Sequence, residues 1–102
     1  MNASAQVLQA LDAAQAAMKR ITDAGDRAKL AREAREQITL APWSQVARAG
    51  EAEMHGWLAQ GKDALQAIED DPEGDDVVRL VQEGLWAAQE LERDLRQLVG
   101  AR

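Results

Sequence analysis

The side chains that could support catalysis are few. His55 is the single histidine, the chain has neither cysteine nor tyrosine, and the serines Ser4 and Ser44 lie far from His55 along the sequence. A nucleophile needs a base within hydrogen-bond reach, and no such pairing is indicated here. No glycine-rich phosphate loop is present either. The sequence therefore predicts a protein that is not an enzyme and has no cofactor, with His55 an ordinary surface or rim histidine.

The acidic side chains offer a second possible chemistry, the binding of a metal ion. Glu51 and His55 are four residues apart, but Glu33 and Glu36 belong to another predicted helix, and the predicted core rows are apolar. Six carboxylates crowd into residues 69–76, yet their spacing does not match a calcium loop. We expect no metal site, and a solvated connection that caps the following helix. The acidic patch comprises Glu69, Asp70, Asp71, Glu73, Asp75 and Asp76.

Charge is distributed unevenly between the two halves of the chain. Residues 1–50 carry seven basic and five acidic side chains, whereas residues 51–102 carry five basic and thirteen acidic ones, and the net charge is −6. This balance disfavours direct binding to a phosphate backbone. The basic segment 19–35 contains no aromatic residue of the kind that stacks on single-stranded nucleic acid. It could instead pair with the acidic half of the same or of a second molecule.

The elements that position these groups are helices. The two prolines, Pro42 and Pro72, both stand where helical patterning stops, and no alternation typical of strands competes with that patterning. The sequence predicts helices near 4–23, 26–40, 43–69 and 76–99, joined at 70–75 by the acidic connection. Residues 1–102 then form a single all-α domain, an antiparallel up-and-down bundle.

The apolar stripe of the first forty residues changes phase near Gly25. This glycine could turn the chain or only kink a continuous helix, so both a three-helix bundle with a kinked first helix and a four-helix bundle remain open. Residues 43–68 repeat with an eleven-residue period that puts Gly61 in one row with Gly50, which would give an opposing helix room to approach. The last helix has the most regular stripe, formed by Val77, Val81, Gly84, Ala88, Leu91, Leu95 and Leu98.

Trp86 stands outside that regular stripe. If the stripe faces the core, Trp86 lies on the outer side of its helix among long polar side chains, which is typical of a binding hot spot. The alternative is that Trp86 packs over a bundle edge, against the helical arm of residues 4–40, with Val78 and Leu85 as companions. Trp43 and Trp57 fall on the core stripe, and we expect both in the core. The predicted contact patch consists of Trp86, Arg79, Glu83, Glu90 and Arg93.

The core available to a monomer is small. Only 20 of 102 residues are Val, Leu or Ile, Phe is absent, and 21 are alanine, which favours helix but buries little area. Docking on a partner, or self-association, would relieve this shortage. We therefore expect an interaction protein.

Two short stretches resemble known families. Trp43–Ser44–Gln45, in a helical chain of this length, is similar to the small WXG-type secreted proteins in size and helicity, although the glycine that defines their motif is missing. Residues 18–26 resemble the first helical turn of flagellar-type export chaperones, over a tenth of the chain. These likenesses assign the chain to no family.

The sequence leads to one functional hypothesis and one alternative. The first is a protein-binding adaptor, export chaperone or inhibitor, possibly homodimeric, whose alanine and arginine usage suggests a bacterial or phage source. The alternative is an acidic anti-defence protein that mimics nucleic acid and inhibits a host nucleic-acid-binding complex. No apolar run approaches a membrane span and the first residues do not resemble a signal peptide, so we expect a cytoplasmic protein.

Overall fold

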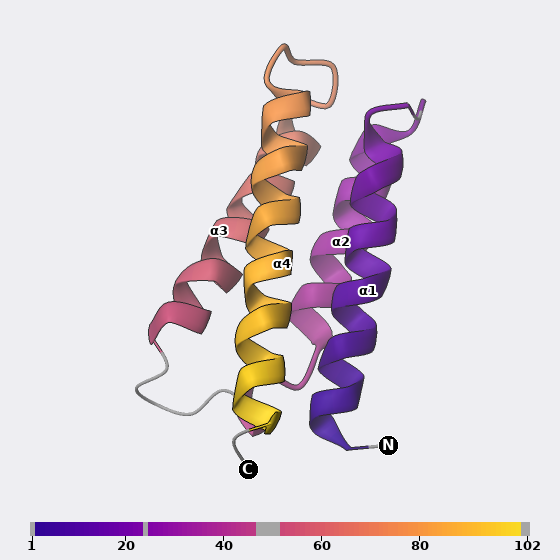
Figure 1. The fold of residues 1–102 in the computed structure, drawn as a ribbon. Helices are drawn as coiled ribbons and strands as arrows, with labels where there is room; N and C mark the ends of the chain where they lie inside the picture. The colour runs from indigo at the N-terminus through magenta and orange to yellow at the C-terminus, as the bar shows by residue number, and fades with distance from the viewer. Residues whose placement is uncertain (1, 24, 47–51, 101–102) are drawn as a thin grey trace.

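The computed structural model describes residues 2–23, 25–46 and 52–100, and in these residues the protein is an all-α bundle (Figure 1). The helical bundle predicted from the sequence is confirmed. Four α-helices and one short 3-10 helix make up the described structure. They are α1 (Ala3–Ile21), α2 (Arg27–Leu40), η1 (Trp43–Gln45), α3 (Ala52–Asp70) and α4 (Val77–Gly100).

The four helices run alternately up and down, as Figure 1 shows. Each α-helix packs on two neighbours: α1 on α2 and α4, and α3 on α2 and α4. The first turn of α1 and the last turn of α4 lie at the same end of the bundle. The α1–α2 and α3–α4 connections both lie at the opposite end. Each seam between helices is therefore formed by an antiparallel pair.

The chain turns at Gly25, so the bundle has four helices rather than three. Helix α1 ends at Ile21 and α2 begins at Arg27. The Arg27 guanidinium donates to the carbonyl oxygen of Thr22 at 2.9 Å and to that of Pro72 at 3.3 Å. It therefore ties the turn to the α3–α4 connection, which a continuous kinked helix could not do.

The helix predicted over 43–69 does not start at Trp43. Residues 43–45 form the 3-10 helix η1, and α3 is described from Ala52 to Asp70. The indole Nε1 of Trp43 donates to the Ile38 carbonyl at 2.6 Å, which satisfies one of the unpaired carbonyls at the end of α2. This bond holds Trp43 back against α2. Gly50, the other glycine of the predicted row, lies outside the described residues.

The predicted stripes meet in the core. The largest fully buried side chains come from all four helices and from Val46; they are Leu11, Met18, Ile21, Ile38, Leu65, Ile68, Leu91, Leu95, Val7 and Val46. Gly61 faces α4, where a Cβ atom would lie 3.6 Å from that of Ala87, an ordinary van der Waals contact, so the approach of α3 and α4 does not require glycine at this position. The tighter position is Gly84 of α4, where a Cβ atom would lie 3.3 Å from Sδ of Met18 on α1. None of the described helices has the length and apolar character needed to cross a membrane.

Candidate interaction surface on helices α3 and α4

The predicted contact residues lie along one side of α4. From Arg79 to Arg93 they are spaced by four, three, four and three residues, so they form a single stripe on the helix. The Arg79 guanidinium pairs with Glu83 at 2.6 Å, and Arg93 pairs with Glu90. Trp86 stands between these two ion pairs, and 54% of its surface is exposed. The structure thus brings the five residues together on one face.

Trp86 packs against Trp57 of α3. The two ring centroids are 5.3 Å apart, and the planes are tilted by 54°, within the range of favourable aromatic pairs. Trp57, which the sequence predicted to be in the core, is only partly buried and packs against the core cluster. It lies about 60° around α3 from the buried Met54, which places it at the edge of the core-facing side.

A polar cluster centred on Arg93 borders the tryptophan pair at one end. The Arg93 guanidinium lies 3.9 Å from the Glu53 carboxylate and 3.6 Å from that of Asp94, in addition to its pair with Glu90. Glu53 also accepts a hydrogen bond from Trp57 Nε1 at 3.5 Å. Because Glu53 belongs to α3, Arg93 links the two helices across the surface. Sequence reasoning did not single out Glu53, since its partner lies on another helix.

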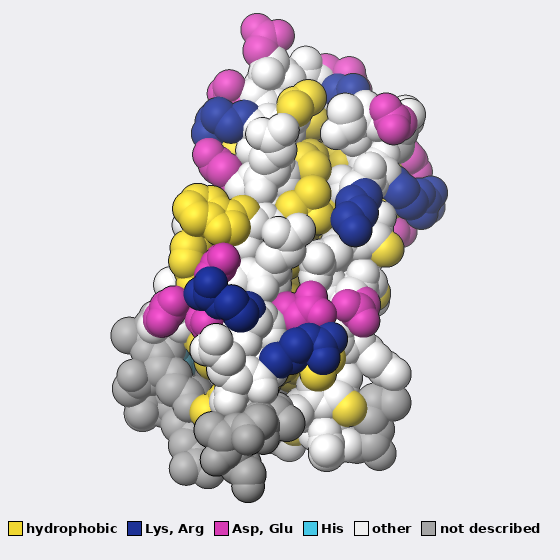
Figure 2. Space-filling view, in the orientation of Figure 1, with side chains coloured by type: hydrophobic (Ala, Val, Ile, Leu, Met, Phe, Trp, Pro, Cys, Tyr) yellow, Lys and Arg dark blue, Asp and Glu magenta, His cyan; other side chains and the backbone are white. Residues whose placement is uncertain are grey.

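Beside the tryptophan pair, the surface between α3 and α4 is hollowed. A hollow of about 450 Å³ is lined by Gly56, Ala59, Gln60, Asp63, Ala64, Leu80 and Glu83. A smaller one of about 260 Å³ is lined by Glu53, Gly56, Trp57 and Gln60. The two share Gly56 and Gln60, so they adjoin. Figure 2 shows a hydrophobic group on this side of the molecule, with charged groups above and below it.

Gly56 is required by no contact within the fold. A Cβ atom there would meet no described heavy atom within 4 Å, in contrast to Gly61 and Gly84, which pack closely against neighbours. Glycine inside a helix costs about 1 kcal/mol relative to alanine. Its effect here is to leave the hollow open. The sequence does mark this residue, because Gly56 is a mid-helix glycine that lies outside the apolar stripe.

His55 and the acidic side chains were the other candidates for chemistry in the sequence. His55 is exposed, as expected. In residues 2–23, 25–46 and 52–100 no group of three or more histidine, aspartate or glutamate side chains is placed to hold a metal ion. The α3–α4 surface holds an aromatic pair, ion pairs and an open hollow, which can support binding.

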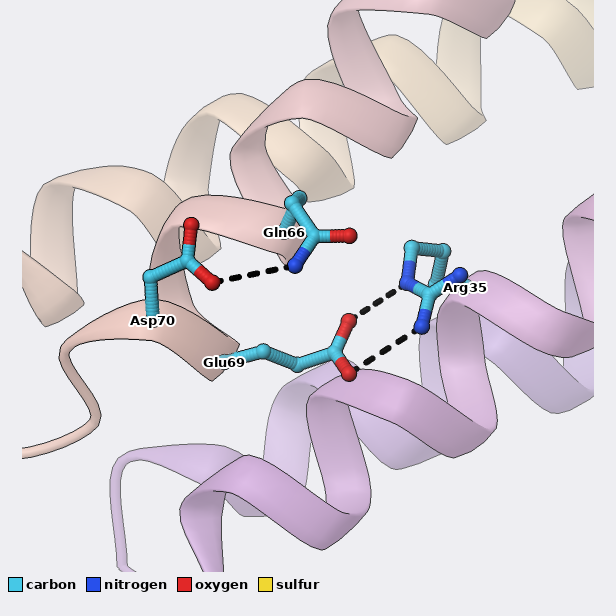
Figure 3. Close-up of polar contacts among 4 residues, drawn as sticks. All are labelled: Arg35, Gln66, Glu69 and Asp70. Atoms are coloured by element: carbon cyan, nitrogen blue, oxygen red, sulfur yellow. Dashed lines mark hydrogen bonds and ion pairs between the residues drawn. The ribbon is translucent and has the colours of Figure 1, made fainter.

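The sequence predicted that Glu69 belongs to a solvated acidic patch, and this prediction was wrong. Its side chain is only 14% exposed and accepts two hydrogen bonds from Arg35 of α2, one from Nε to Oε2 and one of 3.1 Å from a terminal nitrogen to Oε1 (Figure 3). The hydrogen bond to Glu69 raises the pKa of the Arg35 guanidinium. Asp70, by contrast, turns away and accepts from Gln66 at 3.1 Å. Glu69 therefore joins α2 to α3.

The other five acidic residues are exposed: Asp70, Asp71, Glu73, Asp75 and Asp76. Two of them face arginines, since Glu73 lies 3.7 Å from Arg27 and Asp76 lies 3.4 Å from Arg79. The Arg27–Glu73 and Arg35–Glu69 pairs show that the basic segment pairs with the acidic half within one molecule. The charge of the α3–α4 connection is partly neutralised as a result.

The comparisons with known proteins do not identify the chain. No protein-family model, no curated protein and no solved structure matches the chain significantly.

Proposed function

We propose that this chain is a non-enzymatic protein-interaction module that binds its partner through the surface of α3 and α4. The observation that carries the proposal is Trp86, a large aromatic side chain left 54% exposed beside Trp57. Tryptophan is enriched among the residues that dominate binding energy, since it buries a large area with few rotatable bonds. A folded monomer gains little from exposing such a side chain.

The surroundings of Trp86 fit the anatomy of an interface. Arg79 and Glu83 lie on one side of the aromatic pair and the Arg93 cluster lies on the other. An aromatic centre with a polar, solvent-accessible rim is the usual arrangement of protein interfaces. The rim would orient the partner and the tryptophans would supply most of the binding energy.

Within this proposal, the protein acts as an adaptor, an export chaperone or an inhibitor of bacterial or phage origin that works in the cytoplasm. The support is compositional: arginine outnumbers lysine nine to three beside abundant alanine, and the side chains needed for catalysis are scarce.

The test is capture of a partner by three purified baits: the natural chain, Trp86→Ala and Leu40→Ala. Leu40 is a matched control because it is a large apolar side chain, 81% exposed, on α2. The captured protein is identified by mass spectrometry and then titrated by calorimetry. We expect Trp86→Ala to weaken binding by roughly 30-fold while Leu40→Ala leaves it unchanged. Equal affinity of all three baits, with circular dichroism unchanged, would contradict the proposal.

A second candidate function follows from the five exposed carboxylates at one end of the bundle. In this hypothesis they occupy the nucleic-acid groove of a host complex, as an acidic mimic. A variant in which Asp70, Asp71, Asp75 and Asp76 are changed to asparagine would then lose the captured partner, and Trp86→Ala would keep it. Capture that survives the fourfold variant would eliminate this candidate.

A further inference from the structure

We propose that the α3–α4 surface binds a basic segment of a partner protein, whose arginine side chains enter the two hollows beside Trp57 and Trp86. The inference rests on the proposed function, because it takes the same surface as the binding site and names the chemistry of its occupant. Three features of the surface support a basic occupant: its excess of negative charge, the composition of the hollow walls and the exposed indole faces.

Two guanidinium groups, those of Arg79 and Arg93, stand among more carboxylates than they can neutralise. The carboxylates in contact with them are Asp76 and Glu83 beside Arg79, and Glu53, Glu90 and Asp94 beside Arg93. A further carboxylate, that of Asp63 at the larger hollow, has no hydrogen-bond or ion-pair partner in the part of the chain that the structure describes. A cationic occupant is attracted to this surface, whereas a second copy of the chain would bring the same carboxylates against one another.

Each hollow combines carboxylates with an apolar or aromatic wall. The larger hollow, of about 450 Å³, has the carboxylates of Asp63 and Glu83 beside the side chain of Leu80. The smaller hollow, of about 260 Å³, has the Glu53 carboxylate beside the indole of Trp57. A basic side chain has the same division, since it carries a cationic head on an aliphatic stem. In either hollow the stem can lie on the wall while the head reaches a carboxylate.

The two indoles favour arginine as the basic side chain. Trp86 is 54% exposed, and its ring centroid lies 5.3 Å from that of Trp57. Tryptophan offers the most favourable aromatic face for a cation, and the planar guanidinium of arginine can stack on such a face while its N–H groups donate to a carboxylate. The Glu53 carboxylate is close to the aromatic pair, because it accepts from Trp57 Nε1 at 3.5 Å. A guanidinium over the indoles would therefore find an acceptor beside them.

Gly56 keeps the approach to both hollows open. It lines each of them, and a Cβ atom at this position would have no described heavy atom within 4 Å. A larger side chain here would occupy the space that an incoming arginine needs and would leave the charge of the surface unchanged. Substitution of Gly56 therefore separates the contribution of shape from that of charge.

The experiment is an NMR titration of the isotopically labelled chain with a short arginine homopeptide, followed through the indole N–H signals of its three tryptophans. The signals of Trp57 and Trp86 should shift as the peptide binds. The signal of Trp43 should stay in place, because its Nε1 is bonded to the Ile38 carbonyl at 2.6 Å inside the bundle. Trp43 thus serves as an internal control in the same sample.

Three variants locate the peptide on the surface. Asp63→Lys should raise the Kd of the peptide by roughly 10-fold, because it places a like charge at the larger hollow. Asp12→Lys is the matched control: it makes the same change of net charge at an exposed position on α1, and it should raise the Kd by less than about twofold. Gly56→Leu should raise the Kd by roughly 10-fold with an equal or higher Tm, because leucine fills the hollows and favours helix.

Three outcomes would overturn the inference. The first is a titration in which the signals of Trp57 and Trp86 do not move. The second is an equal effect of Asp63→Lys and Asp12→Lys, which would mean that the peptide responds to the net charge of the chain. The third is a Kd unchanged by Gly56→Leu, since the arginines would then lie outside the hollows.

The proposed function is tested separately from its basic occupant. A chain that captures another protein through Trp86 but does not bind the arginine peptide would remove the basic occupant and leave the proposed function standing. If Trp86→Ala changes neither peptide binding nor capture, both proposals fail.

Discussion

Tryptophan has a structural role at the corner that contains Trp43 and a candidate binding role at the surface that contains Trp57 and Trp86. Trp43 is 8% exposed, and its indole nitrogen donates to the Ile38 carbonyl at 2.6 Å. Trp86 is largely exposed, and its described ring contact is with Trp57. A buried indole with a satisfied N–H closes the end of α2, whereas an uncovered ring beside a hollow is available to another molecule. Burial and hydrogen bonding, rather than residue type, distinguish the structural tryptophan, Trp43, from the candidate binding residue, Trp86.

The largest expected effect is on the stability of the two regions. Trp43→Ala should lower the free energy of unfolding by about 3–5 kcal/mol, because it leaves a cavity and an unpaired carbonyl. Trp86→Ala should lower it by less than about 1 kcal/mol, since the ring is mostly in solvent already. Urea denaturation followed by circular dichroism measures both. Similar losses for the two variants would remove the distinction between the regions.

The inner and outer sides of the α3–α4 seam can be compared through their glycines. Gly84→Leu should lower the free energy of unfolding by about 1–3 kcal/mol, because even the Cβ atom that it adds would lie 3.3 Å from Met18 Sδ. Gly56→Ala should raise it by about 0.5–1 kcal/mol, since the space is open and alanine favours helix. Thermal and urea unfolding of both variants provide the test. A destabilising Gly56→Ala would show that the fold needs this glycine.

The smallest expected effect is on the pH dependence of the free energy of unfolding, and it comes from the flank of α4 that meets α1. Glu92 accepts hydrogen bonds from Arg96 at 2.8 Å and from the buried Gln15 at 3.2 Å, and these bonds lower the pKa of Glu92 below its ordinary value of 4.5. Because the folded-state pKa is the lower one, the stabilisation is complete above about pH 4.5. It is lost as the pH falls through the folded-state pKa.

The natural chain should therefore be more stable than Glu92→Gln at about pH 6, and the difference should shrink toward about pH 3. Urea unfolding at several pH values measures it, with Asp12→Asn, an exposed position on α1, as the control for loss of one charge. A difference that does not vary with pH would mean that Glu92 contributes through packing and not as a carboxylate.

Most of the fold could be predicted because each helix carries its own pattern. The stripe from Val77 to Leu95 is buried as expected, and Gly61 faces Ala87 of the neighbouring helix, as its row indicated. The separate 3-10 helix at residues 43–45 could not be predicted, since the hydrogen bond between Trp43 and Ile38 forms only when η1 folds back on α2. The choice between a turn and a kink at Gly25 likewise depends on contacts with distant residues such as Pro72.

The candidate surface could be predicted in part. The stripe on α4 identified Trp86 and its charged neighbours, because spacing along one helix determines which side chains share a face. Trp57, Glu53 and Gly56 were missed, because their relation to Trp86 exists only when α3 lies beside α4. Glu69 was misassigned for the same reason, since its partner Arg35 is on α2.

The amino-acid sequence by itself determined the helices, their apolar faces and an outward tryptophan, because these depend on side chains a few residues apart on the same helix. Only the tertiary structure decided what lies next to that tryptophan: a second indole, an arginine cluster and a hollow kept open by glycine. The physical reason is that helical periodicity defines a direction around one helix axis, whereas the neighbour in that direction depends on how all four helices pack.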